Sequence, residues 1–180
     1  MKIGICGICG RMGVSVLRIL LARGHSLGAA FDHDGAPSFG CDAGVLIHAE
    51  SMHVPIAAVN PGGVGNTDGV IDFSSPAAPA RLIEIALVKK RPMVIGTTGL
   101  PEDGRREIER ASKTIPVLFS PNMSFGGNML FKLTEIASRA RTKEYDVEIM
   151  ELHRSRKKDA PSGTANRLLA HVQSAMGDPE

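Results

Sequence analysis

The 180-residue sequence contains no tryptophan, and its other aromatic residues are one tyrosine and six phenylalanines. Proteins that bind single-stranded nucleic acids stack the bases on aromatic side chains, and nucleic-acid-binding domains carry a marked excess of basic residues. The formal net charge of this chain is only +2. We therefore expect no nucleic-acid partner.

Long apolar runs are also missing. No segment approaches the roughly 20 apolar residues that a membrane-spanning helix needs, and the N-terminus has no apolar core of a secretory signal. Three cysteines are too few for a disulfide framework, and their odd number favours a reducing compartment. We expect a cytoplasmic protein with no membrane partner.

The sequence does contain a regular alternation of short apolar runs and helical patterns. Strands separated by helices form a parallel sheet with right-handed crossovers and helices on both faces. The fold class is therefore expected to be α/β, with a Rossmann-type doubly wound parallel sheet. Strands are expected at residues 3–6, 27–31, 70–73, 93–95 and 117–119, and helices at residues 12–23, 77–90 and 102–113.

Two regions depart from this alternation. Residues 35–66 are rich in Gly, Pro and Ala, and we expect loops there with one short strand or helix. The pattern changes again near residue 123, so we divide the chain into a domain of residues 1–123 and a smaller α+β lobe of residues 124–180. In this lobe helices are expected at residues 125–141 and 164–176, a strand at 146–151 and a polar loop at 153–163.

The stretch KIGICGICGRMGVS near the N-terminus has two interpretations. Cys6 and Cys9 have the C-x-x-C spacing of redox dithiols and of zinc half-sites. A redox pair normally opens a helix with its first cysteine exposed, whereas Cys6 ends an apolar strand. Cys41 is isolated, and no histidine pair accompanies it at the spacing of zinc ligands. We expect two packed cysteines and no metal site.

Gly7, Gly10 and Gly13 fit a dinucleotide-binding loop better. Such a loop needs glycine at its tight turn and where the helix packs on the strand, and the helix N-terminus offers unpaired N–H groups to the pyrophosphate. Asp32 follows the second strand and can accept hydrogen bonds from the adenine ribose, although a solvated loop carboxylate is the alternative. His33, in place of an arginine, tilts the preference toward NAD.

A second polar stretch, ELHRSRKKDAPSGTA, runs from the expected strand through a basic loop into a helix. Lys157 or Lys158, together with the N–H groups of Gly163 and Thr164 at the helix start, would bind a carboxylate. His153 is able to give or take a proton near neutral pH. From the residues alone, a solvated basic loop with an ordinary helix cap is an equally good interpretation.

Together these motifs resemble the dihydrodipicolinate reductase family of the diaminopimelate and lysine pathway. The matching pieces occur in the family's order, and the run DAPSGTA is close to diagnostic. They are residues 7–13, 72–74, 94–99, 120–124 and 157–165. The resemblance implies an oxidoreductase that uses NADH or NADPH to reduce a small cyclic imine dicarboxylate, dihydrodipicolinate (4-hydroxy-tetrahydrodipicolinate), to tetrahydrodipicolinate.

The resemblance also implies roles for individual residues. It makes His153 an acid–base group and Lys157 the proton donor, and it implies no metal. The cofactor contacts that it implies are Gly7, Ile8, Cys9, Gly10, Arg11, Met12, Asp32, Gly96, Thr97, Thr98, Ser120, Pro121, Asn122 and Met123. The substrate contacts that it implies are Arg154, Ser162, Gly163 and Thr164.

Two departures from the family pattern are visible. Arg154 stands where members usually have a second histidine, and an arginine keeps a donor but cannot switch protonation. Family chains also continue well beyond this length, so we expect the substrate lobe to be incomplete. The family's members are homo-oligomers, but an incomplete lobe gives no basis for predicting the same assembly here. The alternatives are a non-catalytic nucleotide-binding fragment of that enzyme, or another imine or amine dehydrogenase of similar architecture.

Overall fold

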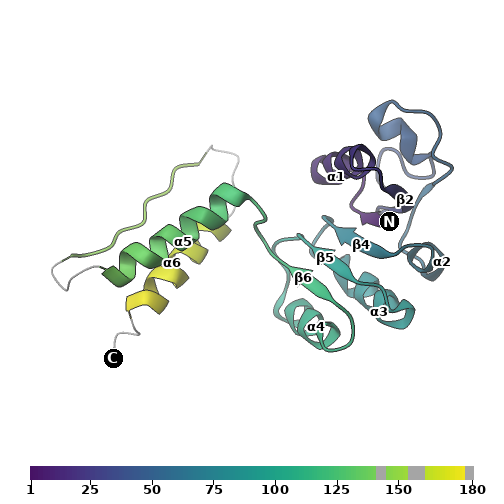
Figure 1. Ribbon diagram of the computed structural model, residues 1–180. Helices are drawn as coiled ribbons and strands as arrows, with labels where there is room; N and C mark the ends of the chain where they lie inside the picture. Colours follow the sequence, from purple (N-terminus) through teal and green to yellow (C-terminus); the bar gives the residue numbers. More distant parts are fainter. Residues whose placement is uncertain (141–144, 154–160, 177–180) are drawn as a thin grey trace. The chain divides into compact units, whose positions relative to one another are not determined.

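The computed structural model describes residues 1–140, 145–153 and 161–176. The chain forms two compact units, Met1–Pro121 and Asn122–Glu180, which are described separately below (Figure 1). In the described part of the chain, no helix combines the length and the apolar character needed to cross a membrane.

The first unit is built on a six-stranded sheet in which all neighbouring strands are parallel. The order β3-β2-β1-β4-β5-β6 reverses direction between β1 and β4, and such a reversal opens a crevice at the carboxyl ends of the strands. The expected Rossmann-type sheet is confirmed. The strands are β1 (Lys2–Cys6), β2 (Ser26–Phe31), β3 (Ile56–Ala57), β4 (Gly69–Asp72), β5 (Met93–Ile95) and β6 (Val117–Phe119).

Helices cover both faces of this sheet. Figure 1 shows α1 (Arg11–Ala22) on one side and α3 (Pro79–Lys89) and α4 (Glu102–Ser112) on the other. Two separate apolar clusters match these layers, because Leu17 of α1 packs with β1 residues and Leu82 of α3 packs with β4 and β5 residues. Each such fully buried side chain stabilises the fold by about 1.5–3 kcal/mol.

The region of residues 35–66 holds three short elements, where we expected one. They are the 3-10 helix η1 (Ala43–Ile47), the strand β3 and the helix α2 (Pro61–Gly65). Strand β3 has only two residues and is defined by its pairing with Ala30 and Phe31 of β2. A strand this short leaves no alternating pattern, so its place in the sheet follows only from tertiary pairing.

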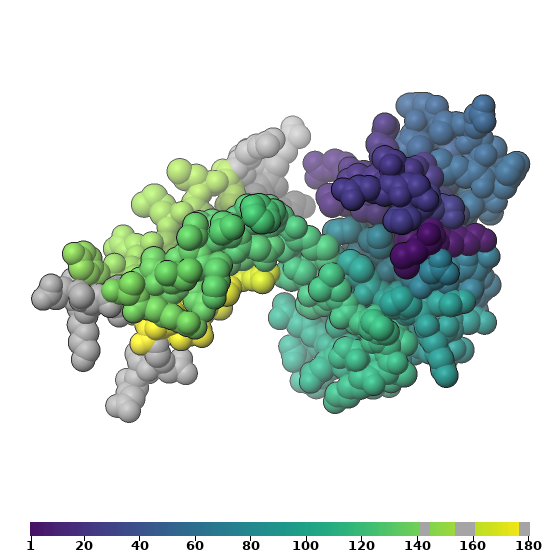
Figure 2. All heavy atoms as spheres, viewed as in Figure 1, coloured from purple at the N-terminus to yellow at the C-terminus, as the bar shows by residue number. Residues whose placement is uncertain are grey.

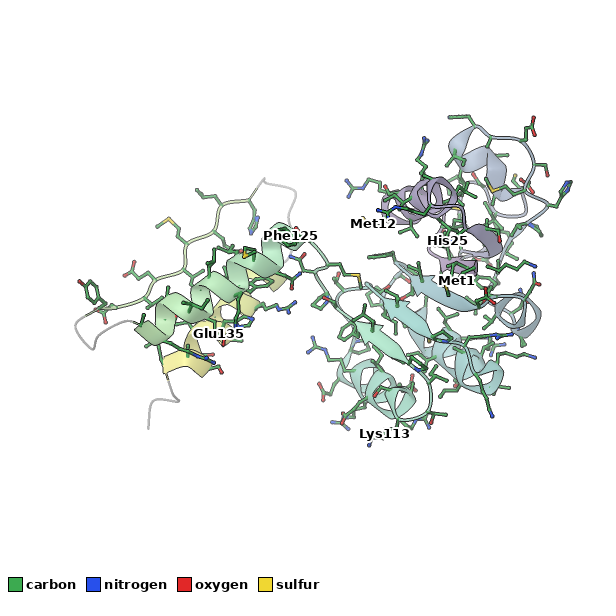
Figure 3. All side chains as sticks on the ribbon, in the orientation of Figure 1. Met1, Met12, His25, Lys113, Phe125 and Glu135 are labelled. Carbon is green, nitrogen blue, oxygen red and sulfur yellow. The ribbon has the colours of Figure 1, made fainter. Side chains whose placement is uncertain are left out.

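In the described part of the second unit, the helices α5 (Phe125–Ala140) and α6 (Gly163–Met176) pack against each other. Phe131 of α5 is buried and stacks on His171 of α6 with ring centroids 5.7 Å apart, and the Arg167 guanidinium lies 4.7 Å from the Phe131 ring centroid. Glu135, labelled in Figure 3, forms ion pairs with Lys132 and Arg139.

The strand that we expected at residues 146–151 is not present. Residues 145–153 are extended without strand pairing, and they run along the α5–α6 pair (Figures 1 and 2). A strand needs a hydrogen-bonded neighbour, and no strand is assigned among the described residues of this unit. The described residues of this unit are therefore helical or without regular structure, and the strand expected at 146–151 is not assigned among them.

Candidate functional site

A cavity of about 580 Å³ opens at the carboxyl ends of the first unit's strands. Its volume lies in the range of small-molecule and cofactor sites, roughly 300–1,000 Å³. The wall comes from the loops after β1, β2, β3 and β4 and from the start of α3. The lining residues are Cys6, Gly7, Cys9, Gly10, Asp32, His33, Ala36, Pro37, Ala58, Val59, Phe73, Ser74, Ser75, Ala77, Ala78 and Arg81.

The loop after β1 requires glycine at two places. Gly7 has a φ of +75°, and a Cβ there would lie 2.3 Å from the backbone oxygen of Phe73. A Cβ on Gly13 would lie 2.2 Å from the backbone oxygen of Gly7, so only glycine lets α1 approach the loop this closely. The tight turn and the close helix packing of a dinucleotide-binding loop are thus both present.

The start of α1, directly after the cavity-lining Gly10, has free hydrogen-bond donors. Gly10 is the N-cap and has no side chain to cap the helix. The N–H groups of the first helical turn, at Arg11, Met12 and Gly13, have no acceptor within the helix. Because these donors lie at the positive end of the helix dipole, they suit an anionic group such as a pyrophosphate.

The residues before the helix, Gly7 to Gly10, donate hydrogen bonds from their N–H groups that shape the loop. The N–H groups of Gly7 and Ile8 donate to the Phe31 oxygen at 2.9 and 3.2 Å, and that of Gly10 donates to the Gly7 oxygen at 3.1 Å. The side chain of Ile8 is fully buried in the core. These residues therefore hold the turn, and the unpaired donors come from the first turn of α1, where Met12 is exposed (Figure 3).

Asp32 lies where β2 ends, on the cavity wall. Its Oδ2 accepts a hydrogen bond from the Cys9 N–H at 2.8 Å, and its Oδ1 accepts one from the His33 N–H at 2.9 Å. The His33 ring lies 3.8 Å from the same carboxylate. Each carboxylate oxygen can accept more than one hydrogen bond, so Asp32 retains acceptor capacity for a ligand hydroxyl.

The two cysteines of the C-x-x-C pattern are not arranged as a redox pair. Burial raises the pKa of the Cys6 thiol, and the nearby Asp72 carboxylate raises it further. Burial and the Asp32 carboxylate raise the pKa of Cys9 to about 11. Reactive cysteines have a lowered pKa and an electropositive environment. Both thiols are instead held in the protonated form near neutral pH.

The ends of β4 and β5 are joined by a buried hydrogen-bonded network. Thr97 Oγ1 donates to Asp72 Oδ2 at 2.6 Å, and Ser74 Oγ donates to Asp72 Oδ1 at 2.5 Å. Asp72 is fully buried, and this burial raises its pKa. Thr97, expected as a cofactor contact, uses its hydroxyl inside this network.

Gly96 lies against the ring of Phe73. A Cβ added to Gly96 would lie 2.0 Å from a carbon of that ring.

The structure gathers only part of the expected cofactor set around the cavity. Gly7, Cys9, Gly10 and Asp32 line it, whereas Ile8, Arg11, Met12 and residues 96–98 and 120–123 do not. Four other lining residues were not predicted as contacts. Phe73, Ser74 and Ser75 directly follow a buried strand, which was the available signal, and Arg81 lies in the first turn of α3.

A second cavity, of about 430 Å³, lies in the second unit and contains expected catalytic and substrate residues. His153, Ser162 and Thr164 line it together with Glu151, which we had not assigned a role. Ser162 caps α6, because its Oγ accepts the Ala165 N–H at 3.1 Å. The other lining residues are Ile149, Met150, Ala165 and Leu168. Arg154 and Lys157 lie outside the described residues.

Glu151 connects the parts of this second site. Its Oε2 lies 2.8 Å from His153 Nε2, and its Oε1 accepts the Ser162 N–H at 2.8 Å. Hydrogen bonds from Ser162, followed by that from His153, lower the pKa of Glu151 to about 2. Gly163 and Thr164 begin α6, so their N–H groups are free of helical partners and suit a ligand carboxylate.

Comparison with protein families identifies matches over almost the whole chain. A model described as dihydrodipicolinate reductase, N-terminus, matches residues 1–123, and one described as dihydrodipicolinate reductase, C-terminus, matches residues 126–179. The 4-hydroxy-tetrahydrodipicolinate reductase of Dechloromonas aromatica is 42% identical over 98% of this chain and 66% of its own length. That of Geobacter sulfurreducens is 35% identical over the same two shares. The chain thus spans slightly less than two thirds of these relatives.

Solved structures show the same fold. The dipicolinate-bound dihydrodipicolinate reductase from Paenisporosarcina sp. TG-14 matches with a TM-score of 0.74 and 21% identity, over 100% of this chain and 68% of that chain. A probable dehydrogenase from Thermotoga maritima matches with a TM-score of 0.51 and 19% identity, over 77% of this chain and 40% of that chain.

Proposed function

Because the chain belongs to the dihydrodipicolinate reductase family, we propose that it carries the cofactor site and part of the substrate site for the NAD(P)H-dependent reduction of 4-hydroxy-tetrahydrodipicolinate to tetrahydrodipicolinate. A Rossmann-type sheet alone hosts many activities. The observation that carries this proposal is the cavity in which His153 lies beside the start of α6. An acid–base group and free N–H donors there suit a substrate that is both an imine and a carboxylate.

The cofactor would bind in the first unit, at the cavity beside Asp32. The free N–H groups at Arg11, Met12 and Gly13 would hold the pyrophosphate, and Asp32 would hold the adenine ribose. Residues 96–98 and 120–123 would border the nicotinamide end. His33 lacks the fork of donors that suits a 2′-phosphate, while Arg81 on the same cavity offers one. Arg81 therefore supports the use of NADPH as well as NADH.

The substrate would bind in the second unit. One carboxylate would accept hydrogen bonds from the N–H groups of Gly163 and Thr164, as helix starts commonly bind anions. The hydroxyl group would leave with a ring hydrogen as water to give dihydrodipicolinate. Hydride from the reduced cofactor and a proton from His153 or Lys157 would then add to this ring to give tetrahydrodipicolinate and the oxidised cofactor. The Paenisporosarcina reductase, bound to the planar dicarboxylate dipicolinate, supports this class of ligand. The cytoplasm, with its nicotinamide pool, is the proposed location.

Spectrophotometric turnover tests the proposal. Purified chain is mixed with NADPH or NADH and 4-hydroxy-tetrahydrodipicolinate, and oxidation of the cofactor is followed. We expect His153→Gln to lower kcat by about 10²–10⁴-fold, the range for loss of a general acid or base, with the KM for the cofactor unchanged. His25→Gln, on an exposed histidine of the first unit, is the matched control.

Two results would count against this assignment. Turnover by His153→Gln at the wild-type rate would remove the acid–base role of His153. Saturable cofactor binding by the wild type without turnover would favour the non-catalytic nucleotide-binding fragment, consistent with a chain that spans 66% of its Dechloromonas relative.

A further inference from the structure

We propose that Glu151 is a positioning residue that fixes His153 with its proton on Nε2, so that Nδ1 is the nitrogen that exchanges a proton with the substrate. This inference rests on the proposed function and deepens it. Glu151 belongs to neither the acid–base nor the substrate residues that the family resemblance implies. Its position between those two sets is a property of this structure.

The geometry places one carboxylate between two parts of the site. Glu151 Oε2 lies 2.8 Å from His153 Nε2, and Oε1 accepts the Ser162 N–H at 2.8 Å. The side chain of Glu151 is only 25% exposed, which limits the competition from water for these contacts. Because both oxygens are engaged, rotation of the carboxylate would break one contact or the other. The imidazole is thereby held in one orientation.

The protonation state of Glu151 decides which nitrogen of His153 carries the hydrogen. Hydrogen bonds from Ser162 and His153 lower the pKa of Glu151 to about 2, so this carboxylate is ionised at neutral pH. An ionised carboxylate only accepts hydrogen bonds, and a neutral imidazole has one N–H and one bare nitrogen. Nε2 must therefore donate to Glu151. Nδ1 is bare in the neutral ring and carries the proton that is exchanged with the substrate when the ring is protonated. The same arrangement orients a histidine through its second nitrogen in many acid–base sites.

Glu151 also supports the start of α6. The N–H that it accepts belongs to Ser162, whose Oγ accepts the Ala165 N–H and caps the helix. The free N–H groups of Gly163 and Thr164 follow directly. Loss of the carboxylate is therefore expected to affect proton transfer at His153 and substrate binding at α6 together, and to leave the cofactor site in the first unit unchanged.

The test uses nitrogen NMR of the full chain labelled in its histidine rings, with the His153 signals identified by their loss in His153→Gln. We expect the wild type to carry the proton on Nε2. In Glu151→Gln the amide oxygen can still accept the Ser162 N–H, and the amide NH₂ then points a donor at Nε2. We therefore expect this variant to shift the population to the Nδ1-protonated tautomer and to lower kcat by about 10²-fold.

Glu135→Gln is the matched control. Glu135 also lies in the second unit near a histidine, His171, at 3.9 Å. This substitution should leave the His153 tautomer unchanged. Circular dichroism compares the helix content of each variant with that of the wild type, and the cofactor KM of Glu151→Gln should equal that of the wild type.

The inference is overturned if wild-type His153 is protonated on Nδ1, or if Glu151→Gln changes neither the tautomer nor kcat. The wild-type tautomer decides the first point even if Glu151→Gln fails to fold, because its assignment needs only the spectra of the wild type and of His153→Gln. A wild type that does not turn over would contradict the proposed function, whereas the tautomer measurement would still support or overturn the role of Glu151. The two failures are therefore distinguishable.

Discussion

The Cys9 backbone N–H donates a 2.8 Å hydrogen bond to Asp32 Oδ2, which ties the loop after β1 to the end of β2. The residue expected to hold the adenine ribose therefore also holds the phosphate-binding loop. A hydrogen bond to a charged group contributes about 1.5–3 kcal/mol to stability. Asp32 thus has a structural and a binding role, which two substitutions can separate.

Asp32→Ala removes both roles, and Asp32→Asn removes mainly the second. The alanine variant should lower the free energy of unfolding by about 1–3 kcal/mol because the Cys9 N–H loses its acceptor. The asparagine variant keeps one acceptor oxygen and should stay closer to the wild type in stability, while both variants should bind NADH at least about tenfold more weakly, a loss of about 1.4 kcal/mol. Urea unfolding and fluorescence titration measure the two quantities. Unchanged NADH affinity in both variants would contradict the ribose role.

Gly13→Ala tests the close approach of α1 to the loop. The added Cβ would lie 2.2 Å from the Gly7 oxygen and 2.6 Å from Ile8 Cα, both backbone atoms that cannot move alone. Such overpacking costs about 1–3 kcal/mol, and the displaced helix start should bind the cofactor less well.

Gly104→Ala is the control for this substitution. Gly104 lies within α4, and the nearest atom to its added Cβ is 3.6 Å away. Alanine is favoured over glycine inside a helix by roughly 0.5–1 kcal/mol, so this variant should unfold at a higher urea concentration than the wild type. Equal stability of Gly13→Ala and the wild type would show that the helix is not held against the loop.

Asp42 gives a prediction in acid. Its carboxylate accepts the Met52, Gly44 and Val54 N–H groups at 2.8, 2.9 and 3.0 Å, and these bonds, that from Met52 first, lower its pKa to about 2. A group whose pKa is lower in the folded state stabilises the fold above its unfolded pKa, and this contribution is lost as the pH falls through the folded pKa.

The stability that Asp42 adds should therefore disappear between about pH 4 and about pH 2. Asp42→Asn should be less stable than the wild type at neutral pH, and the difference between them should shrink as the pH falls through this window. Urea unfolding of both proteins at several pH values measures it. A difference that is independent of pH would show that the charge of Asp42 contributes nothing.

Arg81 should affect NADPH more than NADH. It lines the same cavity as Asp32 and His33, and its guanidinium can pair with a phosphate in a bidentate manner. We expect Arg81→Ala to weaken NADPH binding about tenfold, a loss of about 1.4 kcal/mol, and to change NADH binding little. Arg105→Ala, on the exposed side of α4, is the control. Equal losses for the two cofactors would contradict a role at the 2′-phosphate.

The Rossmann-type sheet could be predicted because its central strands are apolar runs that follow helices at regular intervals. Strands β5 and β6 have the predicted bounds. The predicted strand at 146–151 is not assigned, because alternating apolar residues form a strand only where a neighbouring strand pairs with them. Val147 and Ile149 instead line a cavity of about 330 Å³ with Leu169 and Val172 of α6, and both side chains remain exposed.

The candidate sites could be predicted only where a residue type reveals its role. Glycines with no room for a side chain and a histidine beside a helix start leave such a signature. The bond between the Cys9 N–H and Asp32 does not, because every residue but proline has a backbone N–H. The bridge of Glu151 to Ser162 joins residues eleven positions apart through a backbone N–H, which the residue types do not reveal.

Fluorescence titration of NADH and NADPH into the purified chain, with and without pyridine-2,6-dicarboxylate, tests the central claim most directly. The account predicts saturable binding of reduced cofactor, because the glycine loop, the free helix start and Asp32 are all formed. It also predicts that the dicarboxylate tightens this binding. Absence of saturable cofactor binding by the folded chain would contradict the account.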